Sequence, residues 1–389
     1  MSLNPVFALL GRRLRLAVIG GGPGSFIGAT HRQAATLDHR YELVAGALSS
    51  DAARGRQAGL ELGLAPDRSY ASGADLIAGE RARPDGADAI AIMTPNDSHF
   101  ELASAALGQG FDVICDKPMT NTLAEAETLH ATVLASGRVF CLTHNYTGYP
   151  LVRQARAMIA AGELGAIRLV QVEYVQGGNA EQPDAPPGAG WRLDPAKGGP
   201  SLVMGDIGSH AHNLLRFVTG LEVAEVAAEV GNSVPGRRVD DYAGALLRLD
   251  QGARGCFWVT QAAAGVENSL RMRISGVQGT LEWQQEQPQL MSFKPLVGPA
   301  QLRTPNGPGT LALAARAARI VKGHPEGFIS AFANLYADAA EVIAARLAGA
   351  VADPLACQFP NSFDGLQGAR FTAAVLRSSS AGGAWTRLS

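Results

Sequence analysis

The chain has 389 residues, with 33 lysines and arginines against 35 aspartates and glutamates, and a formal net charge of -2 at pH 7. This balance, without a basic run, argues against nucleic acid and against an anionic membrane surface as partners. Hydrophobic residues make up 47% of the chain, enough to form the cores of two domains. No uncharged run is long enough to span a membrane, and early arginines interrupt any signal-peptide core, so we expect a cytoplasmic protein.

The cysteines suggest neither a disulfide framework nor a zinc site. Cys115, Cys141, Cys256 and Cys357 are scattered along the chain, and no two of them form a C-x-x-C pair. A reducing compartment fits this usage, and we expect no bound metal.

The first half of the chain alternates short apolar runs with helical patterns. Strands are predicted at 15–20 and 41–50, with a helical stretch between them. Further strands are predicted at 87–95, 111–118 and 138–146, and each is preceded by a helical pattern. This alternation predicts a doubly wound parallel sheet of the Rossmann type over residues 1–145.

The pattern changes after residue 145. A helix at 151–161 and a strand at 166–176 lead to a loop rich in glycine and proline at 177–200, which is too long for a simple connector. A helix from Asp206 to Thr219 follows. Strand-like runs then arrive at hairpin spacing, and two helices close the chain. Residues 146–389 are therefore predicted to form an α+β domain with a large, mainly antiparallel open sheet, for substrate binding and oligomerisation. The later strands are expected at 222–230, 242–249, 254–261, 270–276 and 279–285, and the later helices at 310–321 and 332–349.

A glycine-rich turn, AVIGGGPGSFIGATH, follows the first predicted strand and opens a helix. Gly20 and Gly22 match the first two glycines of G-x-G-x-x-G, but Ser25 takes the third place and the next glycine is Gly28. Free backbone N–H groups and the helix dipole would hold a pyrophosphate here. We expect Gly20 to permit the tight turn, Gly22 to let the backbone approach the phosphates, and Gly28 to let the helix lie close to the sheet.

The end of the second strand leaves the choice between NAD and NADP open. NAD-binding proteins usually have Asp or Glu there to bind the ribose 2′-hydroxyl. This chain instead has Ser49 and Ser50, then Asp51 and later Arg54. Hydroxyls and an arginine could instead hold a 2′-phosphate. Asp51 could equally well do no more than cap the next helix.

Three further motifs carry residues that could do chemistry. TPNDSH (Thr94–His99) and CDKP (Cys115–Pro118) come at the ends of buried strands, the edge at which doubly wound sheets bind ligands. In GGPSLVMGDIGSHAHNLL, Asp206 and His210 are four residues apart, so on an α-helix they share a face. His212 lies well around that helix, which argues against a metal held by both histidines.

Together with HNYTGYP and WRLDP, these motifs resemble those of the glucose-fructose oxidoreductase / inositol dehydrogenase (Gfo/Idh/MocA) family over nearly the whole chain. Two departures stand out: the glycine turn is longer, and CDKP replaces the family's Glu-Lys-Pro, so Asp116 is one methylene shorter than Glu. The resemblance implies a cis bond between Lys117 and Pro118, and a catalytic set of Lys117, Asp206 and His210. The complete set of expected cofactor contacts is Gly20, Gly22, Gly28, Ser49, Ser50, Thr94, Pro95, Asn96, His99, Asp116 and Lys117.

The resemblance predicts an oxidoreductase that uses NAD or NADP to move a hydride between the nicotinamide and a secondary hydroxyl of a sugar, inositol or related polyol. Histidine has an ordinary pKa near about 6.5, which suits His210 to take the hydroxyl proton. Asp206 would orient the ring or bind a hydroxyl, and Lys117 would stabilise the developing alkoxide. The expected substrate contacts are Tyr146, Trp191, Arg192, Asp206 and His210.

Two alternatives remain open at this point. An NAD-dependent glycosidase would oxidise the ring only transiently and would depart from the usual two-carboxylate mechanism. A non-catalytic sensor would bind the cofactor without turnover. The open sheet, which the family often uses for assembly, leads us to expect a homodimer or homotetramer.

Overall fold

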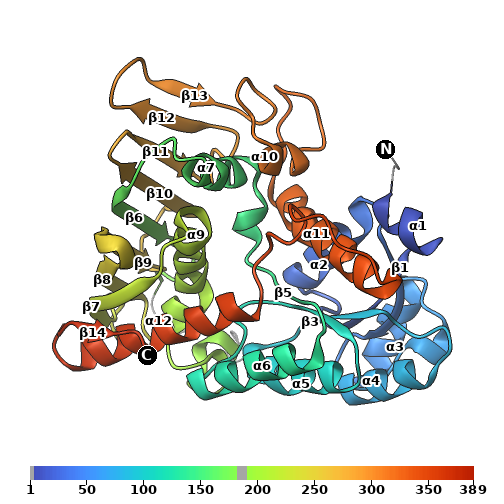
Figure 1. Cartoon of the computed structure of the whole chain (residues 1–389). Coiled ribbons are helices and arrows are strands. Elements are labelled where there is room, and N and C mark those ends of the chain that lie inside the picture. Colours follow the sequence, from blue (N-terminus) through green and yellow to red (C-terminus); the bar gives the residue numbers. More distant parts are fainter. Residues whose placement is uncertain (1–3, 182–190) are drawn as a thin grey trace. The chain divides into compact units, whose positions relative to one another are not determined.

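The structure is a computed structural model that describes residues 4–181 and 191–389 (Figure 1). It divides into two compact units: unit 1 holds residues up to 120, 124–145 and 328–366, and unit 2 holds 121–123, 146–327 and 367–389. The chain therefore returns to unit 1 near its C-terminal end. This return differs from the predicted division into two consecutive domains at residue 145, which assigned 328–366 to the second domain.

Within the described part of the chain, unit 1 is built on a parallel sheet of five strands in the order β2-β1-β3-β4-β5. Helices cover both faces, so the strand residues are almost all buried, as in other parallel sheets. This arrangement confirms the doubly wound fold. The strands are β1 (Leu14–Gly20), β2 (Tyr41–Ala47), β3 (Ala89–Met93), β4 (Asp112–Cys115) and β5 (Phe140–Leu142).

The helices of unit 1 lie in two layers. Figure 1 shows α4, α5 and α6 along one face of the sheet, and α1, α2 and α11 along the other. Their bounds are α1 (Pro5–Leu10), α2 (Phe26–Leu37), α3 (Ala52–Glu61), α4 (Gly73–Ala82), α5 (His99–Gly108), α6 (Leu123–Ser136) and α11 (Phe328–Ala348).

Helix α11 is the main element of the returning segment. By length and composition its 21 residues could cross a membrane, but 78% of its apolar window is buried inside the structure. Phe332, Tyr336 and Ile343 join Leu16 and Val18 of β1 in one hydrophobic cluster. The apolar character of α11 is therefore explained by its place in the core of unit 1.

A buried ion pair fixes α11 to the sheet. Arg346 donates to both carboxylate oxygens of Asp112, the first residue of β4, at 2.6 and 3.1 Å. The Asp112 side chain is 0% exposed and also accepts the Val139 N–H at 2.8 Å. Burial raises the pKa of Asp112, and the bonds from Arg346 and Val139 offset only part of this rise.

In unit 2 the described residues form a sheet of nine strands in the order β13-β12-β11-β10-β6-β9-β8-β7-β14. Neighbours are antiparallel except β6 and β9, which are parallel. The mainly antiparallel sheet is thus confirmed, while the short strands β12 to β14 were not predicted. The strands are β6 (Ile167–Val175), β7 (Val223–Gly231), β8 (Tyr242–Leu249), β9 (Arg254–Thr260), β10 (Ser269–Gly276), β11 (Gly279–Gln284), β12 (Met291–Pro295), β13 (Gln301–Arg303) and β14 (Thr386–Arg387).

Helices cover one face of this sheet. Helices α7 (Pro150–Ala160) and α9 (Ser209–Thr219) pack against each other and on β6, β10 and β11 (Figure 1). On the opposite face, Leu169, Leu246 and Trp258 are 58%, 59% and 43% exposed. Unit 2 therefore presents one sheet face without helices. Helix α10 (Ala312–Arg316) of unit 2 is shorter than the predicted 310–321. Helix α12 (Ser362–Ser380), which was not predicted, begins in unit 1 and continues from residue 367 in unit 2.

We predict that Arg346→Met destabilises the protein by about 3 kcal/mol at neutral pH, because it leaves the buried Asp112 carboxylate without its cation. The substitution raises the folded-state pKa of Asp112 further, so the carboxyl takes up a proton as the pH falls and the penalty shrinks. Urea unfolding of the variant and the wild type at pH 5 and pH 8 measures this difference. Adding Asp112→Asn should recover much of the loss, and an equal loss at both pH values would contradict the explanation.

Candidate active site

The turn between β1 and α2 brings backbone into contact with backbone. Gly20 and Gly21 have φ values of +84° and +68°, which side-chain-bearing residues rarely adopt. A Cβ at Gly28 would lie 2.1 Å from the Gly21 oxygen, so the start of α2 can pack on the turn only with glycine there. The expected close packing of the helix at Gly28 is therefore present.

Gly22 is confined by neighbouring backbone, and its contact with the phosphates stays a prediction. A Cβ at this position would lie 1.9 Å from the Leu48 oxygen, so Gly22 is required by the backbone that follows β2. Ser25 caps α2 by accepting the Gly28 N–H at 3.1 Å. Arg54 donates to the Pro23 oxygen at 3.1 Å and so connects α3 to the turn.

At the end of β2, Asp51 is the N-cap of α3 and accepts the Arg54 N–H at 2.9 Å. The helix-capping alternative is thus present in the structure. The Ser49 hydroxyl accepts the Asp51 N–H at 3.1 Å, and Ser50 is exposed. The serines, Asp51 and Arg54 all lie beside the glycine turn or the start of α3.

The TPNDSH segment follows β3 and is held by internal bonds. Ser98 donates to the Thr94 hydroxyl at 2.7 Å, Pro95 is exposed and Asn96 is buried. The imidazole of His99 is 0% exposed, and its two nitrogens lie 2.8 Å from the Pro118 oxygen and 3.0 Å from the Thr94 oxygen. His99 therefore connects two strand-end loops from inside, and its contact with a cofactor stays a prediction.

CDKP follows β4, and the bond between Lys117 and Pro118 is cis, as the family resemblance implied. Asp116 Oδ1 accepts the Lys117 N–H and the Thr143 hydroxyl, both at 2.9 Å. The Asp116 side chain is 14% exposed. Burial raises its pKa, but His31, Lys117 and His99 outweigh burial, so the pKa of Asp116 lies below its ordinary value. Asp116 is thus an anion held beside the lysine.

The residues of unit 1 fit a dinucleotide. The backbone leaves no room for a side chain at Gly20, Gly21, Gly22 or Gly28. The first N–H groups of α2 have no acceptor within the helix. The ends of β3 and β4 add Thr94 and the Asp116 carboxylate, groups that bind hydroxyls and amides. This combination suits a pyrophosphate at the helix start and a polar ring beyond it.

In unit 2, Asp206 and His210 lie on a helix that is not a regular α-helix. Ser201 caps the helix by accepting the Met204 N–H at 3.2 Å, and residues Met204–Gly208 form a π-turn before α9. The Ser209 N–H accordingly bonds to the Met204 oxygen, five residues back. Asp206 thus lies in the π-turn and His210 in α9, whereas a continuous α-helix from Asp206 was predicted. Such turns often occur at functional sites.

Two tyrosines adjoin His210. The imidazole, 8% exposed, lies edge-on to the Tyr146 ring with 4.8 Å between centroids, and the Tyr174 ring is 6.4 Å away. The two tyrosine hydroxyls are hydrogen-bonded to each other. Burial raises the pKa of both phenols, for Tyr174 well above 10. Both phenols therefore keep their protons at neutral pH.

Carboxamides surround these groups. Gln261 donates to Asp206 Oδ2 at 2.7 Å, and its own oxygen accepts from Asn179 at 2.9 Å. Asn268 Oδ1 accepts from Tyr174 at 2.7 Å and from Gln176 at 2.6 Å. Sequence reasoning missed these residues, because they come from strand ends and loops far apart in the chain and form no motif.

Trp191 and Arg192 lie next to the same carboxylate. Arg192 Nε is 3.7 Å from Asp206 Oδ1, and its guanidinium lies 4.6 Å from the centre of the Trp191 ring. One face of the indole is therefore covered by Arg192. Residues 182–190 of the predicted loop lie outside the described residues.

His212, the second histidine of this helix, packs against an aromatic ring. His212 is 1% exposed and stacks on Phe371 of α12 with 4.2 Å between ring centroids. Across residues 4–181 and 191–389, no group of three or more His, Cys, Asp or Glu side chains could hold a metal ion.

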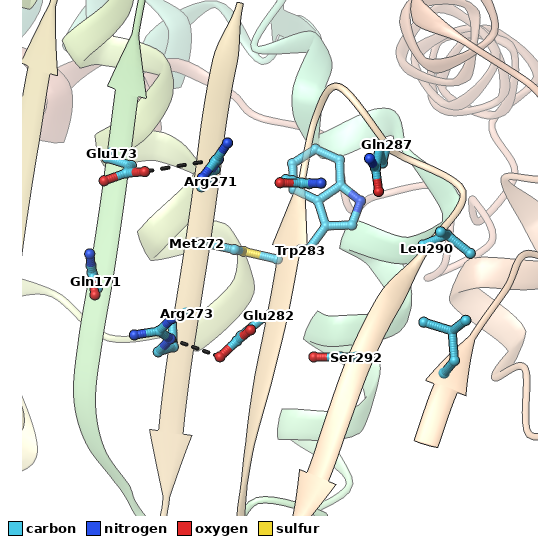
Figure 2. Close-up of a pocket in the computed structure, with 12 residues that line it drawn as sticks. Gln171, Glu173, Arg271, Met272, Arg273, Glu282, Trp283, Gln287, Leu290 and Ser292 are labelled. Carbon is cyan, nitrogen blue, oxygen red and sulfur yellow. Dashed lines mark hydrogen bonds and ion pairs between the residues drawn. The ribbon is translucent and has the colours of Figure 1, made fainter. Parts of the chain in front are cut away.

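A shallow hollow of about 360 Å³ lies on the helix-free face of the unit 2 sheet. Figure 2 shows Arg271 beside Glu173 and Arg273 beside Glu282 on its floor. None of the predicted site residues lines it. The hollow is therefore a separate feature of the sheet surface.

Two family models match consecutive parts of the chain. Residues 14–144 match the model of an oxidoreductase family with an NAD-binding Rossmann fold, and residues 152–282 match that of the GFO/IDH/MocA C-terminal domain. The uncharacterized oxidoreductase YfiI of Bacillus subtilis is 31% identical over 385 residues, which cover 97% of both chains.

Two crystal structures are similar over almost the full length. An oxidoreductase from Sinorhizobium meliloti is 44% identical, with a TM-score of 0.88 over 97% of this chain and 100% of its own. An inositol dehydrogenase homolog from Azotobacter vinelandii, complexed with NADH and myo-inositol, is 35% identical, with a TM-score of 0.90 over 97% of this chain and 98% of its own.

We predict that Gly28→Ala weakens the binding of the dinucleotide at least about tenfold, because its Cβ would force the start of α2 away from the Gly21 backbone. Titration of NADH fluorescence measures the dissociation constant. Gly108→Ala in α5 is the matched control, because a Cβ there meets nothing within 4 Å. Equal dissociation constants for Gly28→Ala and wild type would show that this contact does not shape the binding turn.

Proposed function

The chain belongs to the Gfo/Idh/MocA oxidoreductase family, and on that premise we propose that it is a dehydrogenase that acts on a secondary hydroxyl of a sugar, inositol or related polyol. The observation that carries the proposal is the group in unit 2: a histidine beside two protonated tyrosines, and a carboxylate bound by the carboxamide of Gln261. These groups match the donors and acceptors of a polyhydroxylated ring. The relative crystallised with myo-inositol supports the same substrate class.

We propose NAD rather than NADP as the cofactor. A bound nicotinamide supplies the acceptor for the hydride. Gly20, Gly28 and the start of α2 would hold the pyrophosphate. The Asp51 carboxylate at the start of α3 places negative charge near the expected ribose, which disfavours a 2′-phosphate.

His210 is the proposed base. Oxidation of an alcohol requires loss of its hydroxyl proton, and the raised pKa values of Tyr146 and Tyr174 exclude the phenolates at neutral pH. Asp206, held by Gln261 and facing Arg192, would bind a second hydroxyl and fix the ring. The carboxamides of Gln176 and Asn268 both donate and accept, so they suit neighbouring hydroxyls.

Lys117 is the proposed electrostatic partner of the reacting oxygen. Its ammonium would stabilise the negative charge that develops as the proton leaves. Asp116 accepts the Lys117 N–H and so fixes the backbone from which the side chain projects. Lys117 and His210 are thus both proposed to act on the reacting hydroxyl.

We predict that Lys117→Ala and His210→Ala each lower kcat/KM about a thousandfold, because each removes a group that acts on the reacting hydroxyl. The substrate is found with a panel of inositols and sugars, tested with NAD and NADP and followed at the nicotinamide absorbance band. NAD is expected to give the higher kcat/KM.

The exposed residues Lys322 and His324 provide the controls, and their alanine variants should keep wild-type rates. Near wild-type turnover in Lys117→Ala or His210→Ala would refute the assignment. Release of an aglycone without net reduction of NAD would indicate a glycosidase. Cofactor binding without turnover on any member of the panel would indicate a sensor.

We further propose that the helix-free sheet face joins two copies of this chain. The exposed Leu169, Leu246 and Trp258 lie on strands that also carry charges of both signs. Arg273 pairs with Glu282 at 2.8 Å, and Lys294 lies 3.5 Å from the same carboxylate. A surface with apolar residues among balanced charges can pair with itself about a two-fold axis.

We predict that Trp258→Glu converts the assembly to monomers of 40.5 kDa, because it places a charge in the apolar part of this face. Size-exclusion chromatography with light scattering measures the mass. Val351→Glu is the matched control, since Val351 is 97% exposed and belongs to unit 1. An unchanged multimer in Trp258→Glu would place the interface elsewhere.

A further inference from the structure

His31 is a buried histidine that the proposed mechanism does not use. It lies on α2, three residues beyond Gly28, and is 1% exposed. Its Nδ1 is 2.7 Å from the hydroxyl of Tyr336 on α11. Its Nε2 has no hydrogen-bond partner among the described residues and lies 3.9 Å from Asp116 Oδ1. The ring therefore stands between a phenol and a carboxylate.

The contacts of the ring assign its proton. Burial raises the pKa of Tyr336 well above 10, so the phenol keeps its hydrogen and can donate it to Nδ1. A neutral ring that accepts at Nδ1 carries its own proton on Nε2, and an imidazolium carries one there too. The remaining tautomer would turn an Nε2 lone pair toward an anion. Nε2–H facing Asp116 is thus the arrangement that the surroundings favour.

Both side-chain hydrogen bonds of Asp116 go to the same oxygen, Oδ1. Oδ1 accepts the Lys117 N–H and the Thr143 hydroxyl, and it is also the oxygen nearest His31. In the described part of the chain, neither the Lys117 N–H nor the Thr143 hydroxyl donates to Oδ2. The Asp116 side chain is 14% exposed, so part of the carboxylate can accept from an external hydroxyl.

We propose that His31 is a positioning residue that acts through Asp116: its Nε2–H holds the carboxylate so that Oδ2 can bind a hydroxyl of the dinucleotide beside Lys117. This inference rests on the proposed function and adds the element that orients the carboxylate. Asp116 has one methylene less than the family's Glu, so its reach depends on how firmly it is oriented. His31 supplies that orientation from α2, and Tyr336 fixes His31 from α11.

Other groups also act on Asp116. Lys117 lies next to it in the chain, His99 approaches from α5, and both lower its pKa, whereas burial raises it. Thr143 reaches it from beyond β5, and Cys115 precedes it at the end of β4. Removal of His31 should therefore raise the pKa of Asp116, while Lys117 and His99 continue to lower it. The loss of cofactor binding on acidification should then begin at a higher pH than in the wild type.

Two substitutions separate the two ends of the ring. His31→Asn keeps an acceptor at the position of Nδ1 for Tyr336 but removes the donor toward Asp116. His31→Gln places an amide N–H close to the position of Nε2 and keeps that donor. We expect His31→Asn to raise the dissociation constant for NADH about tenfold, and His31→Gln to stay within about threefold of the wild type. Fluorescence titration of the full chain from pH 5 to pH 8 measures both.

Controls separate positioning from general stability. His130→Asn makes the same change at a histidine of unit 1 that pairs with Ser362 at 2.9 Å, and should leave NADH binding unchanged. Thermal midpoints are recorded for every variant without cofactor. Tyr336→Phe keeps His31 but removes the donor to Nδ1, and should weaken NADH binding by about threefold. This last variant tests the proposal even where His31→Asn fails to fold.

Three results would overturn the proposal. The first is wild-type NADH binding in His31→Asn across the whole pH range. The second is an equal loss in His31→Asn and His31→Gln that follows their thermal midpoints, which would indicate a purely structural role. The third is no change in Tyr336→Phe. The proposed dehydrogenase activity is tested separately by turnover of the wild type and of Lys117→Ala, and stands or falls without these variants.

Discussion

Close contact between backbone segments at the β1 to α2 turn is the constraint on which unit 1 depends. At Gly28 an added Cβ would lie 2.1 Å from the Gly21 oxygen, and at Gly22 it would lie 1.9 Å from the Leu48 oxygen. Glycine at these places lets α2 start directly against the sheet, with its N-terminal N–H groups directed at the turn. The same approach carries His31, one turn further along α2, to the carboxylate that follows β4. The turn therefore sets both the anion site and the position of the His31 ring beyond it.

The two units carry different kinds of polar group. Unit 1 contributes fixed charge at strand ends, where Asp116 is held as an anion by donors and by neighbouring cations. Unit 2 contributes neutral donors and acceptors around Asp206 and His210, and its buried phenols stay protonated. Neutral carboxamides bind hydroxyls without competing for the proton, and the single imidazole remains to accept it.

The features that could be predicted from the sequence are those that depend on residues close together in the chain. Strand and helix alternation, the glycine turn and the motifs around Thr94, Lys117 and His210 are all local, and periodicity or spacing reveals them. The π-turn that contains Asp206 was missed, because a helical pattern does not show where one extra residue enters a turn. The return of 328–366 to unit 1 was also missed, since an amphipathic helix does not specify which sheet it covers.

Contacts between residues far apart in the chain could not be predicted, for the same physical reason. Thr143 in unit 1, and Gln261 and Asn268 in unit 2, come from separate strand ends. Ordinary polar residues there carry no pattern that distinguishes them from surface residues. His31 looked like one more helical residue after the glycine turn. Its environment becomes visible only once α11 places Tyr336 on one side of the ring and β4 places Asp116 on the other. A buried imidazole with a phenol at one nitrogen and a carboxylate facing the other has a defined direction for its proton, and this direction follows from the packing of three elements that are far apart in the chain.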